Sequence, residues 1–242
     1  MTFHIGTSGW SYAHWEHVLY PPGLPRWERL ACYVQQFQAA ELNSSFYRWP
    51  APASFARWRE CLPEGFCLSV KAARGLTHGR RLYAPEAWLG RMAAGVRKLG
   101  AKLGVLLVQL PPDLPRDDAR LAYFLGQLPP ELRVALEFRH PSWHVEPVYA
   151  LLERHGVACC VMSGAHLPCV LRATAPFVYV RLHGPHHHHL YAGSYAEADL
   201  RWWADRLGEW AGQGRDVYAY FNNDGAGHAV RNAARLKALL GI

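Results

Sequence analysis

The chain has 242 residues, of which half are apolar and only 19% are charged, and its formal net charge is +7. This length suits one α/β barrel domain covering residues 1–242, and the apolar content argues against disorder. No apolar stretch approaches the ~20 residues that span a bilayer, so no membrane partner is expected. The positive charge favours anionic partners, although the arginines are scattered rather than clustered.

Short apolar runs typical of buried parallel strands alternate with stretches of helical periodicity along the chain. Strands are expected at residues 3–7, 39–42, 66–70, 104–110, 134–138, 157–161, 177–182 and 217–221. Helical spacing follows most of them, first over residues 27–38. Residues 163–176 show no such spacing, which predicts an irregular connection between strands 6 and 7.

Eight strands alternating with about seven helices, with no linker or fixed repeat, predict a single (β/α)8 TIM-type barrel. A doubly wound open sheet is the alternative, but no G-x-G-x-x-G follows the first predicted strand.

The cysteines and the N-terminus bear on the compartment. The six cysteines form no C-x-x-C pair, and Cys159 and Cys160 lie in an apolar run, where cysteine behaves as a small hydrophobic residue. The first ten residues lack a basic start followed by an apolar signal segment. We therefore expect a reduced cytoplasmic protein with no zinc-finger site, cofactor or resident metal, and the sequence predicts no particular oligomeric state.

The segment RVALEFRHPSWH, residues 133–144, carries the strongest single signal of a site. Glu137 interrupts an apolar strand, and an isolated carboxylate is costly to bury. Strand alternation places Arg139 on the same side as Glu137. The pattern indicates either a functional site or a structural Glu–Arg pair, and the site is the preferred interpretation.

Polar side chains also stand at the carboxyl ends of seven of the eight predicted strands, where barrels of this type carry their chemistry. These residues are Ser8, Glu41, Asn43, Lys71, Gln109, Glu137, Arg139, Arg181, His183, Asn222 and Asn223. They predict one lined pocket.

The charges of this set favour one chemistry over another. Glu41 and Glu137 could act as acid and base, or as acid and nucleophile, or could bind a divalent metal with His183 and Asp224. The cations Lys71, Arg139 and Arg181 favour an anion site with an acid–base pair over a metal site. The alternative is that Lys71–Glu41 and Arg139–Glu137 are only ion pairs in the barrel mouth.

Two aromatic or histidine-rich features leave alternatives open. The run His186–His189 has no cysteine or carboxylate at ligand spacing and is not predicted to be a specific metal site. Trp10, Trp15, Trp49 and Trp143 follow strand ends, where an indole either stacks on a sugar or base or closes the barrel mouth.

Seven ordered motifs resemble the domain-of-unknown-function family 72, also called YecE-like. They are IGTSGWSYAHW, ELNSSFYRWP, SVKAARGLTH, LVQLPP, EFRHPSW, YVRLHG followed by YAGSY, and YFNND followed by AVRNA. The resemblance runs nearly end to end and implies a cytoplasmic TIM barrel, without supplying an activity. The motif positions that carry over are Gly6, Ser8, Trp10, Glu41, Asn43, Lys71, His78, Gln109, Glu137, Arg139, His140, Trp143, Arg181, His183, Tyr191, Asn222 and Asn223. The four-histidine run between HGP and YAGSY departs from the motifs and adds to the argument against a metal there.

The favoured hypothesis is an enzyme, a hydrolase or isomerase, acting on a phosphorylated or otherwise anionic small substrate. Lys71, Arg139 and Arg181 would hold the anion. Glu137 would be the general acid or base and His183 the proton carrier, with Glu41 and Lys71 completing the catalytic set. The expected substrate contacts are Ser8, Trp10, Asn43, His78, Gln109, Arg139, His140, Trp143, Arg181, Tyr191, Asn222 and Asn223.

Two other classes of function remain open. A nucleic-acid binder or phosphodiesterase would fit the net charge, but it is not favoured because no binding motif or metal triad is present. A non-catalytic carbohydrate or metabolite binder would use the same pocket.

Overall fold

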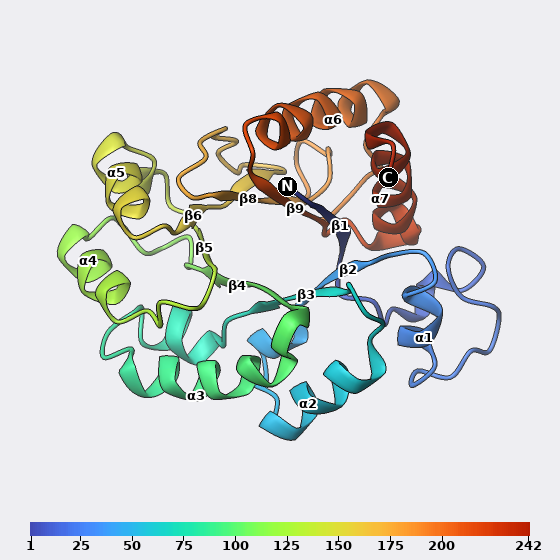
Figure 1. Cartoon of the computed structure of the whole chain (residues 1–242). Helices are drawn as coiled ribbons and strands as arrows, with labels where there is room; N and C mark the ends of the chain where they lie inside the picture. The colour runs from blue at the N-terminus through green and yellow to red at the C-terminus, as the bar shows by residue number, and fades with distance from the viewer. The chain divides into compact units, whose positions relative to one another are not determined.

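The computed structural model describes residues 1–242 and contains nine parallel strands in one sheet, in the order β6-β5-β4-β3-β2-β1-β9-β8-β7 (Figure 1). The strands are β1 Phe3–Ser8, β2 Ala39–Leu42, β3 Cys67–Lys71, β4 Leu103–Gln109, β5 Val134–Glu137, β6 Ala158–Cys159, β7 Val161–Ser163, β8 Phe177–Leu182 and β9 Asp216–Phe221. The strands are nearly all buried, which explains why their sequences read as continuous apolar runs.

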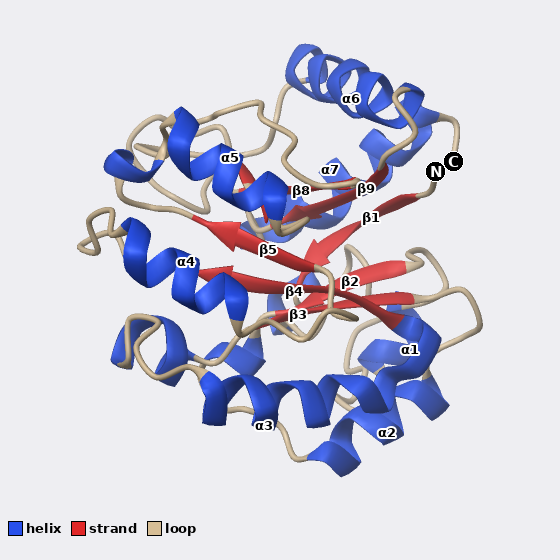
Figure 2. Ribbon diagram, turned by 60° about the vertical axis from the view of Figure 1, so that its left-hand side comes forward, coloured by secondary structure: helices blue, strands red, loops and turns tan.

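Helices alternate with these strands (Figure 2). They are α1 Arg29–Tyr33, α2 Pro52–Cys61, α3 Glu86–Val96, α4 Asp118–Gly126, α5 Glu146–Arg154, α6 Glu197–Gly212 and α7 His228–Leu240. The short helical turns are η1 Ala13–Trp15, η2 Ser44–Phe46, η3 Gly75–Gly79, η4 Arg97–Lys102, η5 Pro141–Trp143 and η6 Gly225–Gly227. The expected TIM-type α/β barrel class is therefore confirmed, with nine strands instead of eight.

The extra strand arises within the predicted sixth strand. Ala158 and Cys159 pair with β5, whereas Val161 to Ser163 pair with β8. Cys160 separates the two short strands, although its backbone N–H still donates to the carbonyl of Leu136. The prediction of one strand over residues 157–161 was wrong in this respect, and the predicted irregular connection after it is confirmed.

Local sequence accounts for several helix boundaries. Pro52 occupies the first turn of α2, where its missing N–H is not needed. Asp117 caps α4, because its side chain accepts from the backbone N–H of Arg120 at 2.9 Å. The predicted helix over residues 27–38 is shorter in the structure, since only Arg29–Tyr33 is α-helical and turns follow.

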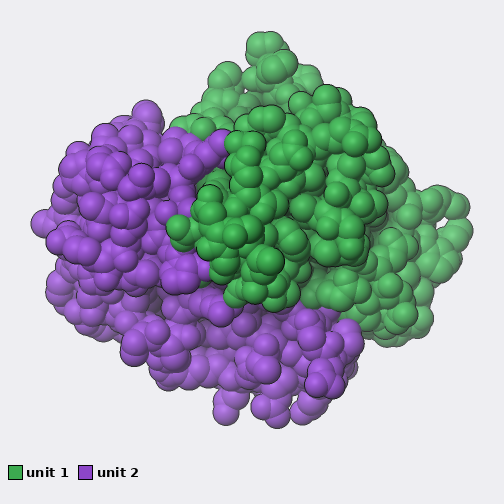
Figure 3. All heavy atoms as spheres, turned by 45° about the horizontal axis from the view of Figure 1, so that its top comes forward, with its two compact units in different colours: residues 1–41, 161–169, 177–242 green, residues 42–160, 170–176 purple.

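The chain divides into two compact units (Figure 3). Unit 1 contains residues 1–41, 161–169 and 177–242, and unit 2 contains residues 42–160 and 170–176. In unit 1, β2, β1, β9, β8 and β7 are neighbours, with α7 packed on β1 and β9. In unit 2, β3, β4, β5 and β6 are neighbours. None of the helices combines the length and apolarity required to cross a membrane.

Candidate functional site

Strand register decides which predicted site residues share a side of the sheet in unit 2. Lys71 on β3 is level with Leu107 on β4, and Gln109 is level with Glu137 on β5. Side chains alternate along a strand, so Gln109 lies on the same side as Leu107. Lys71, Gln109 and Glu137 therefore project from the same side of the sheet, close to the carboxyl ends of their strands.

Lys71 is held by the turn η2, which follows β2. The hydroxyl of Ser45 donates to the carbonyls of Leu42 and Lys71, at 2.7 and 2.6 Å, and so joins η2 to the end of β3. Phe46 on the same turn lies under the ammonium group of Lys71, with Nζ 4.3 Å from the ring centroid. This cation–π contact positions a lysine that is only 7% exposed.

His78 on η3 contacts the same aromatic ring. The rings of Phe46 and His78 meet edge to face, with centroids 5.0 Å apart. Nδ1 of His78 is 2.9 Å from the hydroxyl oxygen of Thr77, so the second ring nitrogen, Nε2, is the one left for other contacts.

The electrostatic surroundings of His78 are predominantly positive. Burial lowers the pKa of His78 from its usual value, and the charges of Lys71, Arg74 and Arg139 lower it further. Asp113 acts in the opposite direction and is itself paired with Arg81. His78 is therefore favoured in its neutral form near neutral pH, inside a region of positive potential.

Glu137 and Arg139 form the ion pair that strand alternation predicted. Nε of Arg139 is 2.5 Å from Oε1 of Glu137, whose side chain is fully buried. Sγ of Cys160 is 4.0 Å from the other carboxylate oxygen. The pairing fixes the direction of the Arg139 guanidinium, whose side chain is 9% exposed.

Asn43 contributes one more polar group to this unit. It precedes η2, and its side-chain oxygen Oδ1 is buried with no hydrogen-bond partner in the protein. A buried polar atom without a partner is costly, and such atoms in native structures call for an explanation. A donor group on a bound ligand is one explanation.

Unit 1 contains a second polar cluster, built around Glu41 at the end of β2. Register places Ser8 level with Glu41 on the neighbouring strand β1. Arg181 on β8 donates to both carboxylate oxygens, from Nε at 3.0 Å and from Nη2 at 2.8 Å. The hydroxyl of Tyr179 donates to Oε2 at 2.7 Å, and that of Ser8 donates to Oε1.

This cluster leaves no acceptor capacity on Glu41. A carboxylate offers about four lone-pair sites, and the four donors occupy them. Glu41 and Arg181 are both fully buried. These two predicted site residues therefore fit a structural role better than direct contact with a substrate, and Glu41 pairs with Arg181.

His183 and Asn222 form a separate contact at the ends of β8 and β9. The Asn222 amide nitrogen lies 3.2 Å from Nδ1 of His183, and both side chains are buried. Tyr191 packs edge to face on His183, with ring centroids 5.4 Å apart, and is 42% exposed. The imidazole predicted to carry protons is thus fully enclosed.

Three other residues that were predicted to contact the substrate make contacts within the protein. The Asn223 amide donates to the Gly193 carbonyl and to the Asn232 side chain, each at 2.9 Å. His140 contacts Ser142 and caps η5. Trp10 follows β1, half-buried, and its carbonyl accepts from the hydroxyl of Tyr20.

Trp143 resolves one of the alternatives left open for the tryptophans. It is 1% exposed, stacks on Phe138 with centroids 4.9 Å apart, and donates from its indole N–H to the Leu114 carbonyl at 2.8 Å. Trp143 is therefore a packing residue.

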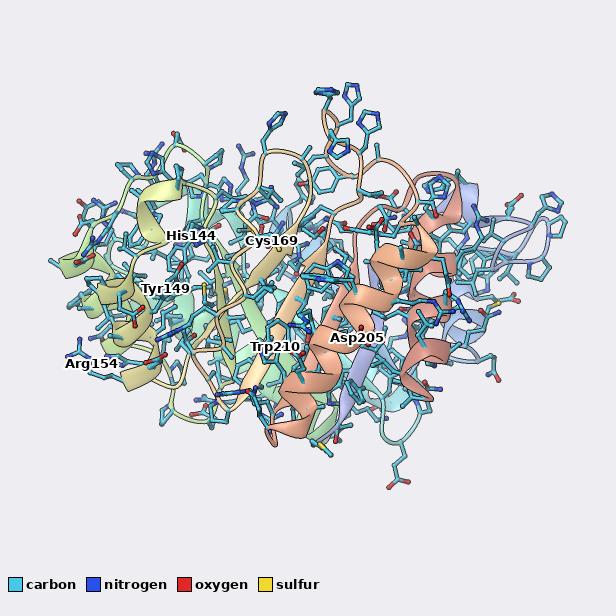
Figure 4. The ribbon with its side chains drawn as sticks, turned by 90° about the horizontal axis from the view of Figure 1, so that it is seen from above. His144, Tyr149, Arg154, Cys169, Asp205 and Trp210 are labelled. Atoms are coloured by element: carbon cyan, nitrogen blue, oxygen red, sulfur yellow. The ribbon has the colours of Figure 1, made fainter.

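The next residue, His144, contacts α5. Its ring nitrogen Nδ1 lies 3.3 Å from the hydroxyl of Tyr149 (Figure 4).

The four-histidine run lies in the loop between β8 and α6. The ring nitrogen Nδ1 of His186 accepts from the backbone N–H groups of His188 and His189, at 3.2 and 3.1 Å. No group of three or more His, Cys, Asp or Glu side chains in the protein is arranged to hold a metal ion.

Sequence reasoning missed Phe46 and Tyr179. Tyr179 lies two residues before Arg181 on β8, and side chains at this spacing point to the same side of a sheet. The sequence alone could therefore have placed Tyr179 next to Arg181. Phe46 stands within the ELNSSFYRWP motif, but its contact with Lys71 depends on how η2 packs on β3.

The parallel strands, the alternating helices and the polar strand ends define an α/β barrel protein with carboxyl-end polar clusters. The family model described as "Protein of unknown function DUF72" matches residues 4–242, and the chain belongs to this family. The resemblance read from the motifs is thus confirmed.

Similar proteins and solved structures agree with this family assignment. UPF0759 protein YunF of Bacillus subtilis is 28% identical over 99% of this chain and 95% of its own length. UPF0759 protein YecE of Escherichia coli K12 is 28% identical over 58% of this chain and 49% of its own length. A DUF72 family protein of Thermotoga maritima has a similar crystal structure, with a TM-score of 0.88, 26% identity and full coverage of both chains. One from Enterococcus faecalis, at 16% identity, shares the fold with a TM-score of 0.84 over 100% of this chain and 96% of its own.

Proposed function

We propose that this protein is an enzyme that acts on a small anionic or phosphorylated substrate, bound in unit 2 at the carboxyl ends of β3 and β5. Lys71 and Arg139 are the anion-binding groups. The observation that carries the proposal is the meeting of Lys71 and His78 on one aromatic ring: Nζ of Lys71 lies 4.3 Å from the centroid of the Phe46 ring, and the centroid of the His78 ring lies 5.0 Å from it. Fixed positive charges in a partly dehydrated site favour an anion more than the same charges in water do.

The two cations complement each other as ligands for a phosphate or carboxylate. The ammonium of Lys71 is a compact charge placed by the ring of Phe46. The guanidinium of Arg139 is planar, a geometry that matches the oxygens of phosphate and carboxylate groups, and its Nε donates to Glu137. Arg181, which the sequence suggested as a third anion ligand, is fully buried against Glu41 and has no part in this proposal.

His78 is the proton carrier in this proposal. Its lowered pKa leaves it neutral near neutral pH, Thr77 engages Nδ1, and Nε2 is left to exchange a proton with the substrate. His183 was the residue favoured by sequence, but it is fully buried, whereas His78 is partly exposed. Hydrolysis and isomerisation both need such a proton carrier.

A screen of phosphorylated and carboxylated small molecules tests the proposal. With a substrate in hand, His78→Asn is expected to lower kcat by about 10²–10⁴-fold, the usual contribution of general acid–base catalysis. Lys71→Met is expected to raise KM, because it keeps most of the side-chain stem and removes the charge. Lys98→Met is the matched control, since Lys98 is exposed on η4 of the same unit. Unchanged kinetics in His78→Asn would contradict the assignment.

A further inference from the structure

Unit 1 contains a cavity lined by residues of α6 and of the loop that precedes it. Its volume is about 280 Å³, and its walls include Pro185, His187, Tyr195, Asp199, Trp202 and Trp203. Asp199 and the two tryptophans lie on α6, and Pro185, His187 and Tyr195 lie in the loop between β8 and α6. None of the groups proposed to bind the anionic substrate lines it.

Helix geometry explains why one carboxylate and two indoles share this cavity. Asp199, Trp202 and Trp203 are spaced i, i+3 and i+4 on α6, and residues at this spacing lie on the same face of a helix. The two indole planes are 87° apart with ring centroids separated by 5.0 Å, so they form a corner. Trp203 is buried, while Trp202 is 44% exposed.

Tyr195 and Asp199 differ in how much of their hydrogen-bonding capacity the protein already uses. The hydroxyl of Tyr195 accepts from the Gly184 N–H at 3.1 Å and donates to the Ser163 hydroxyl at 3.0 Å, so its main hydrogen-bonding capacity is used. Asp199 accepts from the Ala196 N–H through Oδ2 at 3.1 Å, and its other oxygen has no hydrogen bond within the protein. The carboxylate is therefore the anionic group available to a ligand.

Trp202 already attracts a cation from its own helix. The guanidinium carbon of Arg206 lies 5.9 Å from the centroid of the Trp202 ring. Arg206 is paired with Glu209, so its charge is offset there. The indole thus carries the negative ring face that cation–π contacts need.

We propose that this cavity binds a small organic ammonium ion, of the methylated ammonium class. Perpendicular aromatic rings beside a carboxylate are suited to a bulky, weakly hydrated cation, which needs apolar contact and charge but no directed hydrogen bonds. A sugar would need several free polar groups, and an anion would be repelled by Asp199. This proposal does not depend on the proposed enzymatic function, because it uses none of the same residues.

The test is a ligand-observed NMR titration of the full chain with choline, at about pH 8 and constant ionic strength. The comparison ligand is its uncharged carbon isostere, in which a tert-butyl group replaces the trimethylammonium group. Choline is expected to bind and the isostere to bind at least about twofold more weakly, since a cation–π contact contributes roughly a factor of 2–5 at an exposed site and up to about 30 at a buried one. Equal binding of the two ligands, or no binding of choline, overturns the proposal.

Two variants locate the binding. Trp202→Leu keeps an apolar side chain at a partly exposed position, and Asp199→Asn keeps an oxygen that can accept from the Ala196 N–H. Trp202→Leu is expected to weaken choline binding about two- to fivefold, the range of an exposed cation–π contact. Asp199→Asn is expected to weaken it by up to about fivefold, the range of an exposed ion pair. Trp27→Leu is the matched control, because Trp27 is an 81% exposed tryptophan of the same unit. Undiminished binding in both cavity variants overturns the assignment, as does an equal loss in the control.

Discussion

Arg181 and Glu41 form a bidentate ion pair in which both side chains are fully buried. The two residues are separated by 140 positions in the chain and lie on β8 and β2. Because removal of one partner strands a buried charge, the pair is a test of whether this cluster is structural.

We expect Arg181→Gln and Glu41→Gln each to lower the free energy of unfolding by roughly 3–5 kcal/mol. The double variant should recover much of this loss, since neither charge is then left alone. Chemical denaturation of the four proteins measures the coupling. Losses that simply add in the double variant would show that the two side chains do not stabilise each other.

Tyr179→Phe removes one of the four donors to Glu41 without disturbing the pair itself. A hydrogen bond to a charged group contributes about 1.5–3 kcal/mol, so we expect a loss of that size in the free energy of unfolding. Burial, followed by the charge of Glu41, raises the pKa of Tyr179 well above its usual value, so the hydroxyl keeps its proton.

Tyr149→Phe is the comparison for that variant. The Tyr149 hydroxyl contacts the imidazole of His144 at 3.3 Å, and burial raises the pKa of Tyr149 to about 12. This neutral contact should contribute only about 0.5–1.5 kcal/mol. An equal or larger loss in Tyr149→Phe would argue against a special role for the Tyr179–Glu41 bond.

The pH dependence of stability follows from three histidines. Burial is the main cause that lowers the pKa of His78, His144 and His228 below the usual value. The unfolded chain then binds more protons than the folded one, so stability is full above the ordinary histidine pKa of ~6.5 and falls as pH drops below it.

We expect the free energy of unfolding of His78→Asn to fall less steeply below pH ~6.5 than that of the parent protein, because asparagine does not titrate. Urea denaturation of both proteins at several pH values between about 7 and 5 measures the slope. Parallel stability profiles for the variant and the parent protein would show that His78 does not titrate differently on folding.

Strand ends were predictable because hydrophobic runs and their polar terminations are local features. Glu137 and Arg139 pair as alternation along one strand predicted. The partner of Arg181 was not predictable in this way, because Glu41, Ser8 and Arg181 meet through the register of four neighbouring strands, β2, β1, β9 and β8. Register depends on long-range pairing that one sequence does not reveal.

Two element boundaries were also predicted wrongly, because they depend on pairing or hydrogen bonding that the apolar pattern does not reveal. The run over residues 157–161 is continuously apolar, yet it divides at Cys160 because its two ends pair with different neighbours. The pattern over residues 27–38 identified Tyr33 and Phe37, which are both fully buried, but burial periodicity does not set the length of the hydrogen-bonded helix.

Binding of inorganic phosphate, measured by isothermal titration calorimetry at constant ionic strength, tests the proposed anion site most directly. We expect the parent protein and Lys98→Met to bind phosphate, and Lys71→Met to bind it at least about tenfold more weakly, the equivalent of one lost charge-assisted contact of ~1.5 kcal/mol. Phosphate binding that Lys71→Met leaves unchanged, or that Lys98→Met weakens equally, would contradict the proposed anion site.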